Sequence, residues 1–252
     1  MSEQKWYIVA RDGFEGEFPA YGGVSELQAA EGWTPVWLED PQDGVLDRPE
    51  FKPAGAAQVL AGVGAQHIQG AFSTISGAIR RRFPVVVGQE YCAEVQAMGL
   101  TDMGTDGQPM MGMVIEVDVS GGINFGGEYP QISSEWWSQD SSEWENGKWK
   151  LLETTTFTAQ ANYITVYLKS ENRFAYRTQA HFDEFKLFGT DPGNGGGDGG
   201  EISAKLLTIA DAQLALSMKI KDLASQVGGG SIEAKGLIEE AEIKLQEAKA
   251  IL

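Results

Sequence analysis

Two acidic side chains, Glu116 and Asp118, lie two residues apart in the stretch 111–119. On a β-strand they would share one face with their carboxylates about 6 to 7 Å apart, which is near the separation found in glycoside hydrolases. The rest of the sequence contains no further motif that would support catalysis by these carboxylates. His67 and His181 are far apart, and there is no nucleophile elbow, zinc-ligand spacing or phosphate-binding loop. Because a strongly acidic chain carries carboxylates on many outer strand faces, we expect a protein that is not an enzyme.

The side chains that could do chemistry are expected on strands, because short apolar runs recur with a period of two. Such alternation means that one face of each strand is buried and the other is wet. The runs fall at 91–98, 111–120 and 163–169, and a last apolar stretch covers 182–188. The 32 glycines and 7 tryptophans also favour many strands and turns. Residues 1–189 are therefore predicted to form a mainly β domain with two packed sheets.

The composition changes abruptly after this domain. Residues 190–200 contain the run DPGNGGGDGG, which predicts a flexible linker. Residues 201–252 show a heptad seam, with apolar side chains at alternating steps of four and three. The glycines at 228–230 divide this segment into the two helices of an α-helical hairpin. The first seam consists of Ile202, Leu206, Ile209, Gln213, Leu216, Ile220 and Leu223, and the second contains Ile238, Leu245 and Leu252.

The expected hairpin has more apolar surface than it can bury by itself. Two isolated helices of about 22 to 26 residues would be marginally stable. Leu207 and Leu214 widen the first seam, and Ile243 and Ile251 widen the second. We therefore expect hairpins from several chains to associate, as a trimer by preference or as a dimer, with the polar layer at Gln213 setting the register. The alternative is that the hairpin folds back on its own β-domain.

The formal net charge of −17 narrows the range of partners. An acidic surface repels nucleic acid and anionic membranes, so we expect neither as a partner. No run approaches the about 18 apolar residues of a membrane span. The first residues also lack the apolar core of a secretory signal, which predicts a protein made and folded in a cytosol, or one secreted without a usual signal. The single cysteine, Cys92, excludes an intrachain disulfide.

Three stretches of the β-domain resemble jelly-roll carbohydrate-binding modules, a galactose-binding-like family. They are Gly13-Phe14-Glu15-Gly16, Gly32-Trp33 and Phe182-Asp183-Glu184-Phe185-Lys186-Leu187. Domains of this family commonly open with an Asn-Gly-Asp-Phe-Glu-like run and close with a Phe/Ile-Asp-Asp-Val-x-Leu-like run. The resemblance covers about residues 6–189 and implies a jelly-roll β-sandwich. It departs from the family pattern at Arg11-Asp12 and at Glu184.

The resemblance also implies a sugar-binding surface, on the exposed face of one sheet or in loops at its edge. A pyranose ring has a C–H face that stacks on Trp or Tyr, and its hydroxyls pair with groups such as Gln and Glu. Residues of these types occur on the expected wet faces and in loops. The candidate ligand-binding residues are Trp37, Glu94, Gln96, Glu116, Trp136, Trp137, Tyr163 and Tyr167. The same surface could instead contact another protein.

A structural calcium ion that ties the first and last strands together is a further implication of the resemblance. Asp12, Glu15 and Asp183 stand at or near the positions that would supply carboxylates. Ca²⁺ takes about 6 to 8 oxygen ligands, so backbone oxygens would have to complete the site. The alternative is that Asp183 caps a turn or pairs with a basic side chain.

Together these features favour a phage virion protein, such as a capsid decoration protein, a head fibre or a tail appendage. It would assemble in the host cytoplasm, dock on capsid or tail proteins through its helical base, and display several glycan-binding heads. One alternative is an extracellular accessory module that targets a polysaccharide. The other is an architectural jelly roll that binds no sugar.

Overall fold

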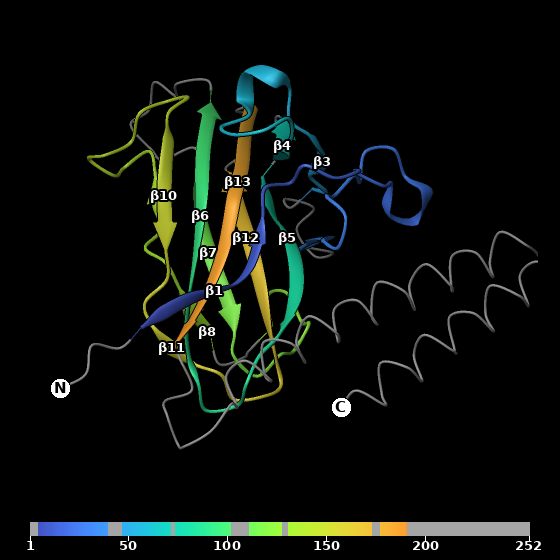
Figure 1. Ribbon diagram of the computed structural model, residues 1–252. Coiled ribbons are helices and arrows are strands. Elements are labelled where there is room, and N and C mark those ends of the chain that lie inside the picture. Colours follow the sequence, from blue (N-terminus) through green and yellow to red (C-terminus); the bar gives the residue numbers. More distant parts are fainter. Residues whose placement is uncertain are drawn as a thin grey trace, which may run out of the picture. The chain divides into compact units, whose positions relative to one another are not determined.

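The computed structural model describes residues 5–39, 47–71, 74–101, 111–127, 131–172 and 177–190 (Figure 1). The chain divides into two units, Met1–Asp191 and Pro192–Leu252, and every described residue belongs to the first. The glycine-rich run after Thr190 and the expected helical hairpin, with its seam from Ile202 to Leu252, lie outside the described residues. Oligomerisation through that seam therefore stays a prediction.

The first of two antiparallel sheets, sheet A, is built around the long final strand β13 of the domain. The order is β10-β6-β13-β4-β3, and β11 also pairs with β6. Strands β1 and β4 pair with consecutive parts of the same edge of β13. The strands of sheet A are β1 (Trp6–Asp12), β3 (Glu50–Pro53), β4 (Gln66–Ala71), β6 (Glu90–Thr101), β10 (Trp149–Glu153), β11 (Phe157–Thr158) and β13 (Arg177–Thr190).

The second sheet, sheet C, has the order β2-β5-β12-β7-β8, and β9 also pairs with β7. Its strands are β2 (Thr34–Trp37), β5 (Ile75–Pro84), β7 (Met111–Asp118), β8 (Gln131–Ser133), β9 (Trp137–Ser138) and β12 (Tyr163–Asn172). Within the described part of the chain the only helical elements are two 3-10 turns, η1 (Tyr21–Gly23) and η2 (Ala56–Gln58). No helix in that part is long and apolar enough to cross a membrane.

The strand order is that of a jelly roll. Along the chain, β4, β5, β6 and β7 alternate between the two sheets, and β12 and β13 do the same. The central strands thus give the order β4-β13-β6-β10 in sheet A and β5-β12-β7-β8 in sheet C. This is the arrangement of a double-sheet jelly roll, which protects most strand edges by pairing. The predicted two-sheet sandwich is confirmed for the described residues.

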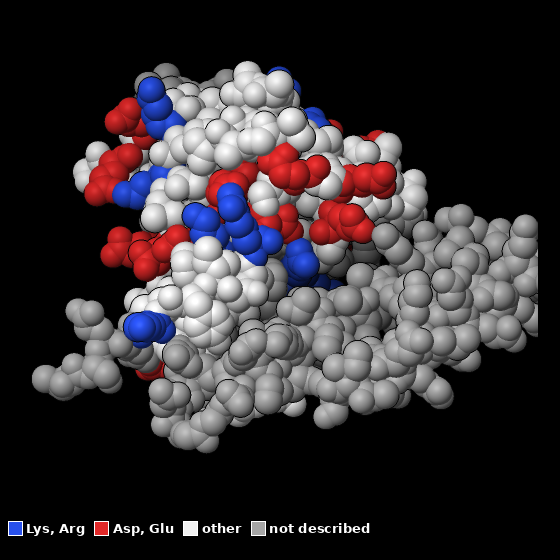
Figure 2. Space-filling model, in the orientation of Figure 1, with Lys and Arg blue, Asp and Glu red and all other residues white. Residues whose placement is uncertain are grey.

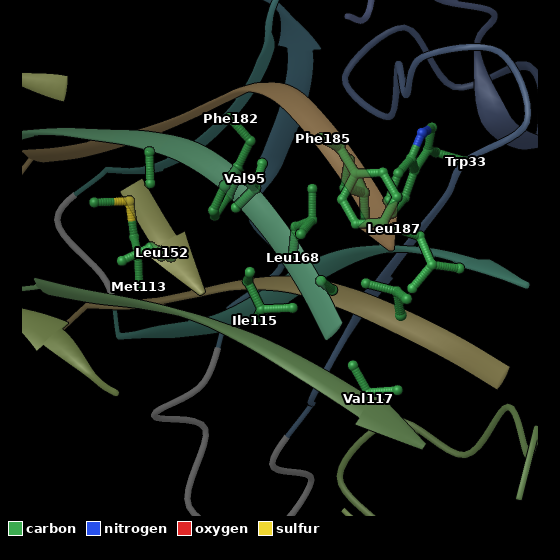
Figure 3. Packing of buried hydrophobic residues seen from close by; sticks show 14 of the residues in the cluster. Trp33, Val95, Met113, Ile115, Val117, Leu152, Leu168, Phe182, Phe185 and Leu187 are labelled. Carbon is green, nitrogen blue, oxygen red and sulfur yellow. The ribbon is translucent and has the colours of Figure 1, made fainter. Parts of the chain in front are cut away.

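The core lies between the sheets and is filled by the inward-facing residues of each strand (Figure 3). Tyr91, Ala93, Val95 and Ala97 of β6 are buried, as their alternation predicted. The same alternation buries Met111, Met113, Ile115 and Val117 of β7 and Ile164, Val166 and Leu168 of β12. Because the apolar side chains of each run lie on one face of the strand, burial of that face determines which side chains of the strand point into the core.

The last strand does not alternate strictly, and a bulge explains how its aromatic residues still reach the core. Phe182 pairs with Ala97 and Lys186 with Glu94, so β13 has one extra residue opposite β6. Glu184 takes up that residue in a left-handed conformation, with φ of 50°. The bulge turns Phe182, Phe185 and Leu187 all toward the core, and each is fully buried.

Candidate functional site

The structure separates the eight candidate ligand-binding residues into three locations. Glu116, Tyr163 and Tyr167 alternate with core residues of β7 and β12, so they lie on the outer face of sheet C. Trp136 lies against the same face, because an added Cβ on Gly112 of β7 would meet its indole. Glu94 and Gln96 lie on the outer face of sheet A, on the opposite side of the sandwich. Trp37 and Trp137 lie on the core side of sheet C.

Two of the candidate residues on sheet C, Glu116 and Trp136, lie around one lysine, whereas Tyr163 contacts Arg82. Lys169 of β12 places its Nζ 3.1 Å from Oε1 of Glu116 and 2.9 Å from Oε1 of Glu171. The same Nζ lies 5.8 Å from the ring centre of Trp136 and 5.7 Å from that of Phe125. We call Trp136, Phe125, Lys169, Glu116 and Glu171 the Trp136 patch. It combines an aromatic side chain that is 42% exposed with charged groups that can donate and accept hydrogen bonds.

Electrostatics keep the lysine of the Trp136 patch charged. Burial acts to lower the pKa of Lys169, but hydrogen bonds and charge interactions with Glu171 and Glu116 outweigh burial and raise its pKa above the ordinary value. Ser76 on the neighbouring strand β5 donates a 3.0 Å hydrogen bond to Oε1 of Glu171. The carboxylates and the ammonium group are thereby held in place beside the indole of Trp136. Polar side chains that are already ordered lose less conformational entropy when a ligand binds.

Trp136 can lie close to sheet C because its neighbour on β7 has no side chain. A Cβ on Gly112 would lie 2.3 Å from Nε1 and 2.5 Å from Cε2 of the Trp136 indole. Gly112 is not one of the glycines with positive φ, so its backbone suits any residue. The missing side chain of Gly112 therefore leaves room for the Trp136 indole, and the backbone at this position does not itself require glycine.

Replacing Gly112 with alanine should move Trp136 away from the strand. The new methyl group would overlap the indole, and the exposed ring can give way more easily than the sheet. We expect a red shift in tryptophan emission and stronger quenching by acrylamide. Gly16→Ala is the matched control, because its Cβ would meet only Glu31 atoms at 3.8 Å. Emission that is identical in wild type and Gly112→Ala would contradict this placement of Trp136.

The outer face of sheet A carries a different set of groups (Figure 2). Acidic and basic side chains are interspersed across this face. Glu94 pairs with Lys186 on one side and Glu153 on the other. Burial and then the Glu153 charge raise the pKa of Glu94, while Lys186 opposes that effect. Among the described residues, Leu151 is the only exposed large apolar side chain on the strands that pair with β6. The exposed aromatic side chains of sheet A, Trp6 and Tyr7, lie on β1, beyond β13.

Trp37 and Trp137 support the sandwich from its core side. Trp137 is 4% exposed and its ring lies 4.7 Å from that of Trp144. Trp37 packs 6.4 Å from the ring of Phe51 and donates a hydrogen bond to Glu39. These two tryptophans point inward because Pro35 and Trp37 alternate with Thr34 and Val36, and because Trp137 pairs with the core residue Met113. The adjacent pair Trp136-Trp137 thus places one ring outside and one inside.

The three carboxylates expected to bind calcium each accept hydrogen bonds from the protein. Asp12 accepts from the Trp33 indole at 2.8 Å and from Arg81 at 2.7 Å. Asp183 accepts from the backbone N–H groups of Leu60 and Ala61. Glu15 accepts from the backbone N–H of Val63 at 2.7 Å.

The loop before β4 thereby connects Glu15, just after β1, to Asp183 of β13, which is the connection expected of the ion. Among the residues that the structure describes, no group of three or more His, Cys, Asp or Glu side chains could hold a metal ion. The donors are N–H groups where a Ca²⁺ site needs converging oxygens, so these carboxylates as placed do not fit the ion. Calcium binding by the protein stays a prediction.

Three members of the Trp136 patch were not predicted as ligand-binding residues from the sequence. Lys169 and Glu171 continue the alternation of Tyr163 and Tyr167 along β12, so their face was available from the pattern. Phe125 follows Gly121-Gly122 in the segment after β7, and nothing in its local sequence indicates that it returns over the sheet. Its placement depends on contacts with Tyr167 and Lys169, which are distant in sequence.

The fold and the Trp136 patch together define a jelly-roll β-sandwich with an aromatic and charged surface on one sheet. By structure, the chain is similar to the CBM22-1 xylan-binding domain of Paenibacillus barcinonensis Xyn10C, with 15% identity, a TM-score of 0.45, and coverage of 75% of this chain and 97% of that one. It is also similar to TmCBM61, solved in complex with beta-1,4-galactotriose, with 14% identity and a TM-score of 0.40. That match covers 62% of this chain and 88% of TmCBM61. A third similar structure is TmCBM27, a carbohydrate-binding module that recognises mannan, with 12% identity and a TM-score of 0.41. That match covers 73% of this chain and 98% of TmCBM27. No protein-family model matches the chain, and no curated protein matches it either.

Proposed function

We propose that the β-sandwich binds a glycan without catalysis and that the Trp136 patch is its binding surface. The observation that carries this proposal is an exposed indole held beside a lysine and two carboxylates. The indole offers a face for the C–H groups of a sugar ring, and Lys169 and Glu171 offer partners for its hydroxyls, while the buried Glu116 holds Lys169 in place. The sequence resemblance to carbohydrate-binding modules supports the same function.

The environment of the paired carboxylates supports a role in binding and not in hydrolysis. Glu116 pairs with Lys169, and Asp118 accepts hydrogen bonds from the backbone N–H and the hydroxyl of Ser120. Glu116 is 7% exposed and Asp118 only 1%. A glycoside hydrolase needs one carboxylic acid and one carboxylate facing the scissile bond with space for the sugar between them. Two carboxylates that are buried and engaged do not offer that space.

Replacing Trp136 with alanine tests the proposal. We expect glycan affinity to fall by about 2- to 12-fold, which corresponds to about 0.5 to 1.5 kcal/mol for a lost aromatic contact. Calorimetric titration with soluble xylan, galactan and mannan oligosaccharides, with calcium and with EDTA, would provide the affinities. The matched control is Trp6→Ala, because Trp6 of β1 is 40% exposed and lies on the other sheet. Equal losses in both variants, or no loss in Trp136→Ala, would place the sugar elsewhere.

We further propose that several such heads are displayed on an oligomeric helical base as part of a phage virion. The support is the heptad seam of residues 201–252 and the glycine-rich run before it. Weak individual sugar sites gain avidity when several copies are linked. Capsid or tail proteins would be the partners of the base. The mass in solution of the full chain, compared with a chain ending at Gly189, tests this: a trimer or dimer against a monomer is expected, and two monomers would contradict it.

A further inference from the structure

One segment crosses the outer face of sheet C beside the Trp136 patch. We call residues 119–127, which follow β7, the strap. The backbone of the strap comes close to β12 at Gly121, where an added Cβ would lie 2.5 Å from the carbonyl oxygen of Tyr163. Its Ile123 carbonyl accepts a hydrogen bond from Arg80 of β5, and an added Cβ on Gly126 would meet Leu38, just beyond β2. The strap therefore runs from β7 across β12 and β5 toward β2.

The side chains beneath the strap are polar and sealed from solvent. Thr165 and Tyr167 of β12 are fully buried, and Asp118 of β7 is 1% exposed, although all three lie on an outer sheet face. The ring of Phe125 packs over Tyr167 at 5.6 Å. Thr165 lies between the contact points of the strap at Tyr163 and Tyr167. Outer faces of sheets normally leave such polar residues in water, so their burial results from what covers them.

The strap in its observed position leaves a buried polar group without a hydrogen bond within the described part of the chain, which is energetically unfavourable. The hydroxyl of Thr165 is buried without a hydrogen-bond partner among the described residues, and an unpaired buried polar group is unfavourable. Ile123 is 49% exposed, so the strap does not bury this large apolar side chain on closing. Phe125 is the aromatic anchor of the strap, through Tyr167 and Lys169. Gly121 and Gly126 adopt φ of 71° and 75°, and such positions allow the backbone of a segment to turn.

We propose that the strap is a lid over part of the glycan-binding face: its Phe125, although it belongs to the Trp136 patch, blocks the place of the glycan in the closed state, and a bound glycan displaces it. This inference rests on the proposed glycan-binding function of the Trp136 patch. Opening would expose Tyr167 and Thr165, an aromatic ring and an unpaired hydroxyl suited to a sugar, next to Trp136 and Lys169. When only the open state binds, the apparent dissociation constant rises in proportion to the fraction of molecules that are closed. A weaker lid must then increase the apparent affinity.

Phe125→Ala tests the lid, because it removes the anchor and leaves the strands in place. We expect glycan affinity to increase by about 2- to 10-fold, the range that the loss of one aromatic pair implies. We also expect Tyr167 to become reactive toward tetranitromethane without any glycan present. Peptide mass spectrometry distinguishes Tyr167 from Tyr163, which is 38% exposed and serves as the internal reference. Ile123→Ala is the matched control in the same strap and should change neither readout.

The two readouts separate the failure of the lid from the failure of the proposed function. If wild type binds none of the glycans tested, the proposed function fails, and nitration of Tyr167 still decides whether Phe125 holds a cover in place. If Phe125→Ala binds glycan more weakly or equally well, Phe125 is not the anchor of a competing lid and the inference is overturned. A Tyr167 that stays unreactive in Phe125→Ala also overturns it.

Discussion

Replacing Phe185 with alanine is expected to lower the free energy of unfolding by about 3 to 5 kcal/mol, the range for removing a buried aromatic side chain. Phe185 is fully buried. Its ring stacks on Phe83 at 5.1 Å and meets Trp33 edge-on at 5.4 Å. Figure 3 shows Phe185 beside Trp33. The residue also directly follows the Glu184 bulge, so its ring helps to hold β13 in register with both neighbouring strands. A cavity here would cost packing from both sheets at once.

Urea unfolding followed by circular dichroism would measure this loss as a lower midpoint with an unchanged slope. Phe185→Leu should lose less, since it keeps an apolar side chain and leaves a smaller cavity. Tyr21→Ala is a suitable control, because this aromatic side chain is 51% exposed and surface changes usually shift stability by less than about 0.5 kcal/mol. An effect of Phe185→Ala as small as that of Tyr21→Ala would mean that the Trp33–Phe83–Phe185 cluster does not stabilise the sandwich.

The second large effect is a loss of stability in mild acid, caused by a buried pair of histidines. His67 of β4 and His181 of β13 lie directly opposite each other in sheet A, with ring centres 4.5 Å apart. Burial lowers the pKa of His181 to about 4. Burial, then the charges of His181, Lys52 and Arg177, lower the pKa of His67 to about 3. Both rings are therefore neutral in the folded protein at neutral pH.

Protons bound only by the unfolded chain make the stability depend on pH. An unfolded histidine has a pKa of about 6.5, so between about pH 6.5 and 4 the unfolded state binds protons that the folded state does not. Stability is therefore fully present above pH 6.5 and falls as the pH drops toward the folded pKa values. The slope of the free energy of unfolding against pH approaches about 1.4 kcal/mol per pH unit for each histidine.

Urea titrations at pH 7, 6, 5 and 4.5 would measure this slope. The double variant His67→Phe/His181→Phe keeps two stacked rings that cannot titrate, and we expect most of the slope to vanish in it. The comparison removes the contribution of carboxylates such as Asp183, whose raised pKa acts in the opposite direction. Parallel curves for wild type and the double variant would show that these histidines are not shielded from protons in the folded state.

The sequence predicted the parts of the fold that depend on short periods. The alternation around β6, β7 and β12 identified the inward residues and the outward Glu94, Gln96 and Glu116, because a strand has only two faces. What the pattern does not contain is which sheet each strand joins. Glu94 and Glu116 lie on opposite sides of the sandwich since β6 and β7 are consecutive strands of different sheets.

The remaining features of the candidate site depend on contacts between residues distant in sequence. Trp136 and Trp137 are neighbours, yet only Gly112 and Met113 of β7 decide which ring lies outside. Tyr167 was expected on a wet face; it lies on the outer face of sheet C but is fully buried, with Phe125 packed over its ring, and no period predicts that contact. The carboxylates of Asp12 and Asp183 lie near the junction of β1 and β13, as the resemblance implied, and their N–H donors come from Trp33, Arg81 and a loop at Leu60.

The pairing of the first strand with the last has a consequence for protein engineering. Trp6 of β1 is opposite Thr190 of β13, and Gln89 donates hydrogen bonds to the Tyr7 hydroxyl and to the carbonyl of Thr190. The polypeptide thus begins and finishes the sandwich at neighbouring points of one sheet. Domains whose ends are so close tolerate circular permutation and transplantation into a surface loop of a host protein.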